Sequence, residues 1–254
     1  MLLCFLGTAS GTEPMPDRRH SSTVLEVGGD LYWLDAGEAC AVTAHLAGLD
    51  LLQTKKILIS HPHMDHVGGL ANLLWYIRKL SIVKKEEPRG FDLWVPIPEV
   101  ADAVFALLRH TEGDFRISFP IGTKQVKEGE LFREEVAVSA LPNAHMPPRE
   151  DGTPRSYSYL IEAEGRRIVY SGDVKRYEEL DPLIGDGVDA LLIETGHFGL
   201  DTAIAYLRDR PVRRAFFTHN GREVLASREK AKEKLFLHLG DRAVLCEDGM
   251  TVEV

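Results

Sequence analysis

The chain has 254 residues, of which 44% are hydrophobic, and it carries a formal net charge of −9 at pH 7. This length and content fit one large α/β domain or two small ones with a real buried core. The acidic balance argues against broad nonspecific affinity for nucleic acid, which needs an extended basic surface, but leaves open a short nucleic acid held at a local basic patch.

The three cysteines, Cys4, Cys40 and Cys246, are odd in number and contain no Cys-x-x-Cys pair. They predict small buried apolar residues in a reducing compartment, and argue against a disulfide scaffold or a structural zinc cluster. The apolar stretch before Gly7 is shorter than a signal peptide needs, and no stretch approaches the ~20 apolar residues of a membrane span. We therefore expect a cytoplasmic protein that does not contact a membrane.

Hydrophobic periodicity and turn residues predict elements that alternate along the whole chain. In the first half we expect strands at 2–6, 23–27, 31–35, 57–60 and 93–96, with Gly28 and Gly29 closing a hairpin, and helices at 39–52, 68–80 and 100–109. Further strands are expected at 115–119, 124–127, 132–141, 158–162, 166–171, 190–194 and 214–218, helices at 200–209 and 227–239, and two short strands at the end. Strands in clusters with helices between them indicate an α/β fold of two packed sheets covered by helices outside. No linker is long enough to divide the chain, so we expect a single domain over residues 1–254.

One segment, 60–69, reads SHPHMDHVGG and follows an apolar run. His61 and His63 lie two apart in an extended stretch and therefore share a face, whereas Asp65 and His66 follow where the chain bends into a helix. They can thus face two neighbouring points, as the ligands of a dinuclear hydrolase do. A histidine-rich turn without metal is the alternative, but the full four-residue pattern between a strand and a Gly-Gly helix start argues against it.

A dinuclear site needs more ligands, and three candidates each follow a strand-like run: His145, Asp173 and His219. Each is weak alone, because a lone histidine after a strand is more often structural and an aspartate after Ser-Gly is usually a turn former. Strand ends in one sheet edge can bring them to the histidine cluster.

The order of these residues resembles the metallo-β-lactamase superfamily, over nearly the whole chain. The resemblance is to the ribonuclease Z branch, which processes the 3′ end of tRNA, and to its small phosphodiesterase relatives. The segments 6–11, 21–22 and 35–38 match further signatures of that branch. The resemblance implies a four-layer αββα sandwich, with two packed mixed sheets and helices outside.

The resemblance also implies that His61, His63 and His145 hold one metal, that Asp65, His66 and His219 hold the other, and that Asp173 bridges the two. Nitrogen and oxygen ligands suit zinc, and manganese or iron can occupy the same set. Two such metals share a water and lower its pKa, so that a bridging hydroxide attacks phosphorus or a carbonyl carbon while Asp65 orients it.

His197 lies 22 residues before His219, a placement that resembles a ribonuclease Z histidine near the scissile phosphate. It is predicted to protonate the leaving oxygen, with Glu194 as its orienting carboxylate. A structural or helix-capping histidine is the alternative.

Long-form ribonuclease Z enzymes carry a Gly/Pro-rich arm that grips tRNA, but residues 80–120 contain only Gly90 and Gly113 around a helix-like stretch. The sequence therefore predicts a hydrolase of small or cyclic phosphodiesters and disfavours tRNA as a partner. Three alternatives stay open: a tRNA 3′-endoribonuclease, a thioester, lactone or other carbonyl-ester hydrolase, and an inactive metal-binding protein. A proline-rich loop at 145–152 can shape a small pocket, and Arg18, Arg19 and Arg155 are either phosphate ligands or ordinary surface arginines. The resemblance further implies a homodimer.

Overall fold

Two β-sheets pack face to face in the computed structural model, which describes residues 1–112 and 117–254. The first sheet has the strand order β14 (Met250–Glu253), β1 (Leu2–Gly7), β2 (Ser22–Val27), β3 (Asp30–Leu34), β4 (Thr54–Leu58), β5 (Phe91–Val95) and β6 (Ile121–Gln125). The second has the order β13 (Ala243–Leu245), β12 (Val212–Thr218), β11 (Val188–Glu194), β10 (Arg166–Tyr170), β9 (Tyr157–Ala163), β8 (Val136–Pro142) and β7 (Gly129–Arg133). Both sheets are mixed, since β3 to β6 and β10 to β13 pair in parallel and the remaining neighbours pair antiparallel.

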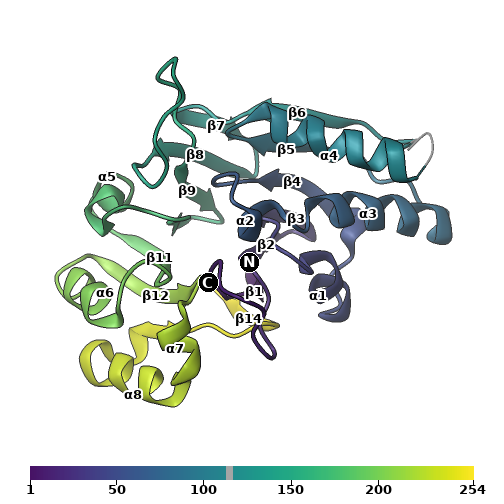
Figure 1. Cartoon of the computed structure of the whole chain (residues 1–254). Coiled ribbons are helices and arrows are strands. Elements are labelled where there is room, and N and C mark those ends of the chain that lie inside the picture. The colour runs from purple at the N-terminus through teal and green to yellow at the C-terminus, as the bar shows by residue number, and fades with distance from the viewer. Residues whose placement is uncertain (113–116) are drawn as a thin grey trace.

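Helices cover the outer face of each sheet (Figure 1). The helices are α1 (Cys40–Leu46), α2 (Met64–Val67), α3 (Leu70–Lys84), α4 (Pro98–Thr111), α5 (Asp181–Ile184), α6 (Leu200–Leu207), α7 (Arg222–Ala226) and α8 (Arg228–Leu239), with 3₁₀ turns η1 (Leu51–Gln53), η2 (Tyr177–Leu180) and η3 (Gly240–Arg242). Figure 1 shows α1, α3 and α4 beside the first sheet, and α5 to α8 beside the second. This is the αββα sandwich that the sequence predicted.

Three apolar layers hold these four layers of structure together. Successive side chains of β1 illustrate the pattern: Leu3 and Phe5 face the core between the sheets, whereas Cys4 and Leu6 face the core beneath α1 and α3. A strand buried on both faces needs a continuous apolar run, and LLCFLG provides it. The third layer lies between the second sheet and helices such as α6 and α8. With both sheets covered on both faces, the edge where strands end is left for a site.

Local predictions were correct for most elements. The hairpin of β2 and β3 turns at Gly28 and Gly29, which have φ of 59° and 89°, as a two-residue hairpin turn requires. The α3 face formed by Leu70, Leu73, Leu74 and Ile77 is buried, as its spacing predicted.

Two of the predicted elements were wrong, and a third could be tested only in part. The helix at 39–52 ends at Leu46, because Gly48 has a φ of 85° and the amides of Gly48 and Leu49 bond back to His45 and Ala44, as in a Schellman helix end. Asp50 then caps a separate 3₁₀ turn. The strand at 132–141 is interrupted and forms the end of β7 and most of β8, which pair antiparallel. The strand at 115–119 falls partly outside the described residues, and 117–119 are not in a strand. Across the described part of the chain, none of the helices has the length and apolar character of a membrane span.

Candidate metal centre

The predicted site residues meet at one edge, where several strands of both sheets end. The segment with His61, His63, Asp65 and His66 follows β4 and continues into α2. His145 follows β8, Asp173 follows β10, His197 follows β11 and His219 follows β12. Ligands of α/β proteins commonly bind outside the carboxyl ends of strands, because the loops there converge.

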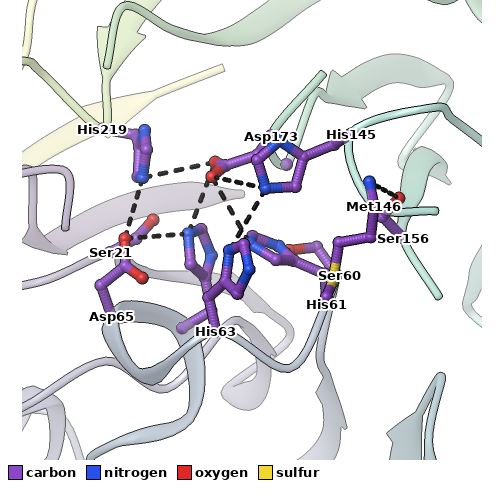
Figure 2. Close-up of polar contacts among 12 residues, drawn as sticks. Ser21, Ser60, His61, His63, Asp65, His145, Met146, Ser156, Asp173 and His219 are labelled. Atoms are coloured by element: carbon purple, nitrogen blue, oxygen red, sulfur yellow. Dashed lines mark hydrogen bonds and ion pairs between the residues drawn. The ribbon is translucent and has the colours of Figure 1, made fainter. Parts of the chain in front are cut away.

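A first cluster of donor atoms consists of three imidazoles and one carboxylate, from His61, His63, His145 and Asp173. His63 Nδ1 lies 3.0 Å from His61 Nε2 and 3.2 Å from His145 Nε2. Asp173 Oδ2 lies 3.4 Å from His61 Nε2 and 3.6 Å from His145 Nε2. Figure 2 shows the three rings turned toward one side of Asp173.

A second cluster lies on the other side of the same carboxylate and consists of Asp65, His66, Asp173 and His219. Asp65 Oδ2 is 3.3 Å from His66 Nε2 and 3.1 Å from His219 Nε2. Asp173 Oδ1 is 3.4 Å from His66 Nε2 and 3.3 Å from His219 Nε2. The two oxygens of Asp173 therefore face different clusters, which is the arrangement of a bridging carboxylate.

The donor spacing of both clusters fits a metal ion. Donors at tetrahedral angles and about 2.0–2.2 Å from a zinc ion lie about 3.3–3.6 Å from one another. Two of the second cluster's buried atoms, His66 Nε2 and Asp173 Oδ1, have no hydrogen-bond partner within the described structure. A buried polar atom without a partner is costly, so its convergence with other donors indicates a cation as the missing partner.

Asp35 organises the imidazoles from behind, and sequence reasoning assigned it no role. Its buried carboxylate accepts hydrogen bonds from the Ser60 amide at 2.6 Å, the Ser60 hydroxyl at 2.7 Å and the Tyr170 hydroxyl at 2.6 Å. His66 Nδ1 lies 2.6 Å from Asp35 Oδ2, and His61 Nδ1 lies 3.0 Å from the Ser60 oxygen. Both histidines therefore carry a proton on Nδ1, which leaves Nε2 as the atom that can bind a metal in the clusters. The only signals in the sequence were its place after β3 and the signature at 35–38.

The two clusters differ in the pKa values of their histidines. Burial, reinforced by neighbouring His66, holds the pKa of His61 well below its usual range. Burial alone would also lower the pKa of His66, but Asp173 and Asp35 raise it well above normal, and Asp173 and Asp65 likewise raise the pKa of His219 to about 10. The pKa of Asp65 is lowered despite burial, because the imidazoles of His219 and His66 lie against its carboxylate. The second cluster thus gathers two imidazoles that hold protons tightly around two carboxylates, and a divalent ion must displace those protons.

Glu194 and His197 stand beside the clusters. The buried Glu194 carboxylate is 2.8 Å from His197 Nδ1 and accepts hydrogen bonds from the amides of His197 and Val174 at 3.1 and 2.9 Å. It also lies 3.5 Å from Nδ1 of His219. The hydrogen bond with Glu194 raises the pKa of His197, despite partial burial. His197 Nδ1 is 3.9 Å from Asp173 Oδ2, so its imidazole lies at the margin of the first cluster.

The structure thus brings all the predicted ligands together and places Glu194 and His197 against them. It does not place Arg18 there. The Arg18 side chain is buried away from the clusters, with its guanidinium nitrogens 3.9 Å from Glu247 and Asp248. In the proline-rich loop, Arg149 pairs with Glu99 of α4 at 2.7 and 3.1 Å.

Comparisons with known proteins agree with this geometry. A family model described as a β-lactamase superfamily domain matches residues 34–220. Ribonuclease Z of Archaeoglobus fulgidus is 26% identical over 312 aligned positions, which cover 99% of this chain and 97% of that protein. Because this chain has only 254 residues, that relative carries segments absent here. The chain covers 45% and 66% of two other ribonuclease Z proteins, from Methanothermobacter thermautotrophicus and Mycolicibacterium gilvum.

Solved structures support the same fold. The short form of human tRNase Z matches with a TM-score of 0.75 and 20% identity, over 100% of this chain and 99% of that one. A diphosphatase from the PhnP family matches with a TM-score of 0.70 and 16% identity, over 100% and 97% of the two chains. At these identities the matches show a shared fold.

Proposed function

The chain belongs to the β-lactamase superfamily of hydrolases, and from this membership we propose that it is a metal-dependent phosphodiesterase for small or cyclic phosphodiesters. The observation that carries the proposal is the pair of donor clusters sharing Asp173, with the imidazole of His197 at their margin. A dinuclear centre suits in-line displacement at phosphorus, and a protonated imidazole suits an alkoxide leaving group.

The fold family implies divalent metals, and we assign two zinc ions to the clusters, with manganese or iron as alternatives. His61, His63 and His145 would hold one ion, Asp65, His66 and His219 the other, with Asp173 shared. Bound there, the ions would lower the pKa of a water and neutralise charge on the non-bridging phosphate oxygens. Their nitrogen and oxygen donors favour zinc, and their spacing fits it.

The chain's own residues would then orient and move protons. Asp65 lies at the edge of the second cluster with a depressed pKa, so it stays ionised and can accept a hydrogen bond from the attacking water. Glu194 holds Nδ1 of His197, which leaves Nε2 to give a proton to the departing oxygen. The hydrogen bond with Glu194 raises the pKa of His197, which favours the protonated form that this step needs.

The preference for a small substrate rests on what lies beside the site. Within the described residues of 80–120, the chain forms the end of α3, then β5 and α4, the region where ribonuclease Z enzymes of the long form carry their tRNA-binding arm. The net charge of −9 also disfavours a large polyanion. A tRNA 3′-endoribonuclease is the second candidate, because the relatives are named ribonuclease Z.

A substrate panel tests the proposal. Purified protein, with its metals counted by elemental analysis, would be assayed on bis-p-nitrophenyl phosphate, a 2′,3′-cyclic nucleotide, a thioester and a precursor tRNA. We expect hydrolysis of the first two, loss of activity after chelation, and recovery with zinc. Cleavage of the precursor tRNA with a kcat/KM above those of the small substrates would select the second candidate. Thioester hydrolysis alone would contradict phosphodiesterase chemistry altogether.

The variant Asp173→Asn should lose the activity together with one or both metals. Asp189→Asn is a matched control, because Asp189 lies on β11 and pairs with Arg166 on the second sheet rather than with the clusters. Equal activity of both variants would remove the bridging role of Asp173.

A further inference from the structure

A cavity of about 460 Å³ is lined by Phe198, the residue after His197. It is lined by the loop after β10, by η2 and by α6, and its lining includes Lys175, Arg176, Tyr177, Phe198 and Tyr206. Lys175 comes two residues after the shared carboxylate Asp173, and Phe198 directly follows His197. The cavity is therefore lined by residues that are close neighbours in the chain of the candidate metal centre, and its size is that of sites for small organic ligands.

One wall of the cavity is a row of aromatic rings. The Phe198 ring lies 6.5 Å from the His197 ring and 4.5 Å from the Tyr177 ring, and Tyr177 stacks on Tyr206 at 5.3 Å. The Tyr177 hydroxyl donates to the Glu194 carbonyl at 2.8 Å, which fixes this row against the strand that carries the orienting carboxylate. Phe198 itself is only half-buried, so its ring remains available to stack with a planar group.

The rim of the cavity beside Phe198 carries two positively charged side chains that are only weakly engaged in ion pairs. Lys175 and Arg176 are both exposed, and the contact of Arg176 with Glu179 is 4.0 Å, the outer limit of an ion pair. Arg210, by contrast, is fully engaged by Asp181 at 2.8 and 2.9 Å, and Glu178 adds one negative charge to the lining. The local preference for an anion thus rests on Lys175 and Arg176.

We propose that this cavity binds the leaving group of the substrate, and that this leaving group is a nucleotide whose base stacks on Phe198 and whose phosphate pairs with Lys175. This inference rests on the proposed function, in which His197 gives a proton to the leaving oxygen. The position of His197 therefore decides which half of the substrate lies in the cavity. In hydrolysis, the oxygen of water bonds to phosphorus and one proton of that water passes to solvent. The bond from phosphorus to the leaving oxygen breaks, and His197 gives a proton to that oxygen and is then reprotonated from solvent. The group attached to that oxygen then lies on the Phe198 side of His197.

Binding of fragments measures this site without relying on turnover. Isothermal titration of the metal-containing protein would compare adenosine 5′-monophosphate, adenosine and inorganic phosphate. We expect the wild-type protein to bind the nucleotide more tightly than either fragment. Phe198→Ala should weaken the nucleotide and adenosine about tenfold and leave phosphate unchanged. Lys175→Gln should weaken the nucleotide and spare adenosine.

Two control variants make the same substitutions outside the cavity. Phe236→Ala removes a phenylalanine that is 64% exposed on α8, and Lys230→Gln removes a lysine of the same helix, so neither should alter nucleotide binding. Equal affinities for nucleotide and phosphate, or equal effects of Phe198→Ala and Phe236→Ala, would overturn the subsite.

Hydrolysis of bis-p-nitrophenyl phosphate, measured on the same preparations, separates this inference from the proposed function. A protein that hydrolyses this diester but does not distinguish nucleotide from phosphate overturns the subsite alone. A protein that binds the nucleotide through Phe198 but hydrolyses no phosphodiester overturns the proposed function, and with it the assignment of the cavity to a leaving group.

Discussion

Replacing Asp35 by asparagine changes one oxygen to an amide nitrogen at the centre of the hydrogen bonds behind the metal clusters. Asp35 Oδ1 accepts from the Ser60 amide, and Oδ2 faces the Ser60 hydroxyl, the Tyr170 hydroxyl and His66 Nδ1. Hydroxyl groups can rotate to accept from the new amide, but the Ser60 backbone amide can only donate. If the asparagine nitrogen took the place of Oδ1, two donors would face each other in a buried position.

With the nitrogen in the place of Oδ2, His66 must instead accept on Nδ1 and carry its proton on Nε2. That atom then donates and can no longer bind a metal. Either orientation loses at least one charge-assisted hydrogen bond, so we expect a loss of stability of about 3 kcal/mol, or roughly 6–12 °C in Tm. Metal affinity should fall by about 10–100-fold, as for other residues that orient metal-bound histidines.

Thermal unfolding and titration with zinc against a chromogenic chelator measure the two effects separately. Asp189→Asn is again the control, because its partly exposed pairing with Arg166 should be worth no more than about 1 kcal/mol and should not alter metal affinity. An Asp35→Asn protein that binds two metals with wild-type affinity would refute the tautomer argument. A loss of stability with unchanged metal affinity would reduce Asp35 to a structural role.

Three further predictions follow from the same geometry. Gly196→Ala should displace His219 and lower metal affinity, because a Cβ there would lie 2.6 Å from His219 Nδ1. Gly199→Ala is the control, since a Cβ there meets nothing within 4 Å, and titration of both variants with zinc should show unchanged affinity for this one. His197→Ala should slow phosphodiesters with alkoxide leaving groups much more than nitrophenyl esters, and equal losses in kcat on both would remove its acid role. Because the pKa of His66 is raised and that of His219 is about 10, metal binding at neutral pH should release protons and tighten as pH rises; calorimetry in buffers of different ionisation enthalpy that detects no proton release would contradict this.

The metal-binding segment could be recognised from sequence because its geometry is local. Two-residue spacing in an extended stretch places His61 and His63 together, and the bend into α2 turns Asp65 and His66 toward a second point. The αββα layers were likewise predictable, since runs such as β1 are apolar at every position while α3 is apolar on one face. One failure occurred where a glycine overrides the apolar periodicity, since the left-handed conformation of Gly48 ends α1 although the apolar spacing continues beyond it.

The sequence by itself thus determined the fold class, the candidate ligands and the kind of chemistry they permit, because these depend on residue type and short-range spacing. Only the tertiary structure decided that the two oxygens of Asp173 face different clusters, that Asp35 sets the tautomers of His61 and His66, and that Phe198 opens onto a cavity. Each of these depends on strand ends from distant parts of the chain meeting at one edge. Such distances cannot be inferred from spacing along the sequence, because they are set by how the two sheets pack.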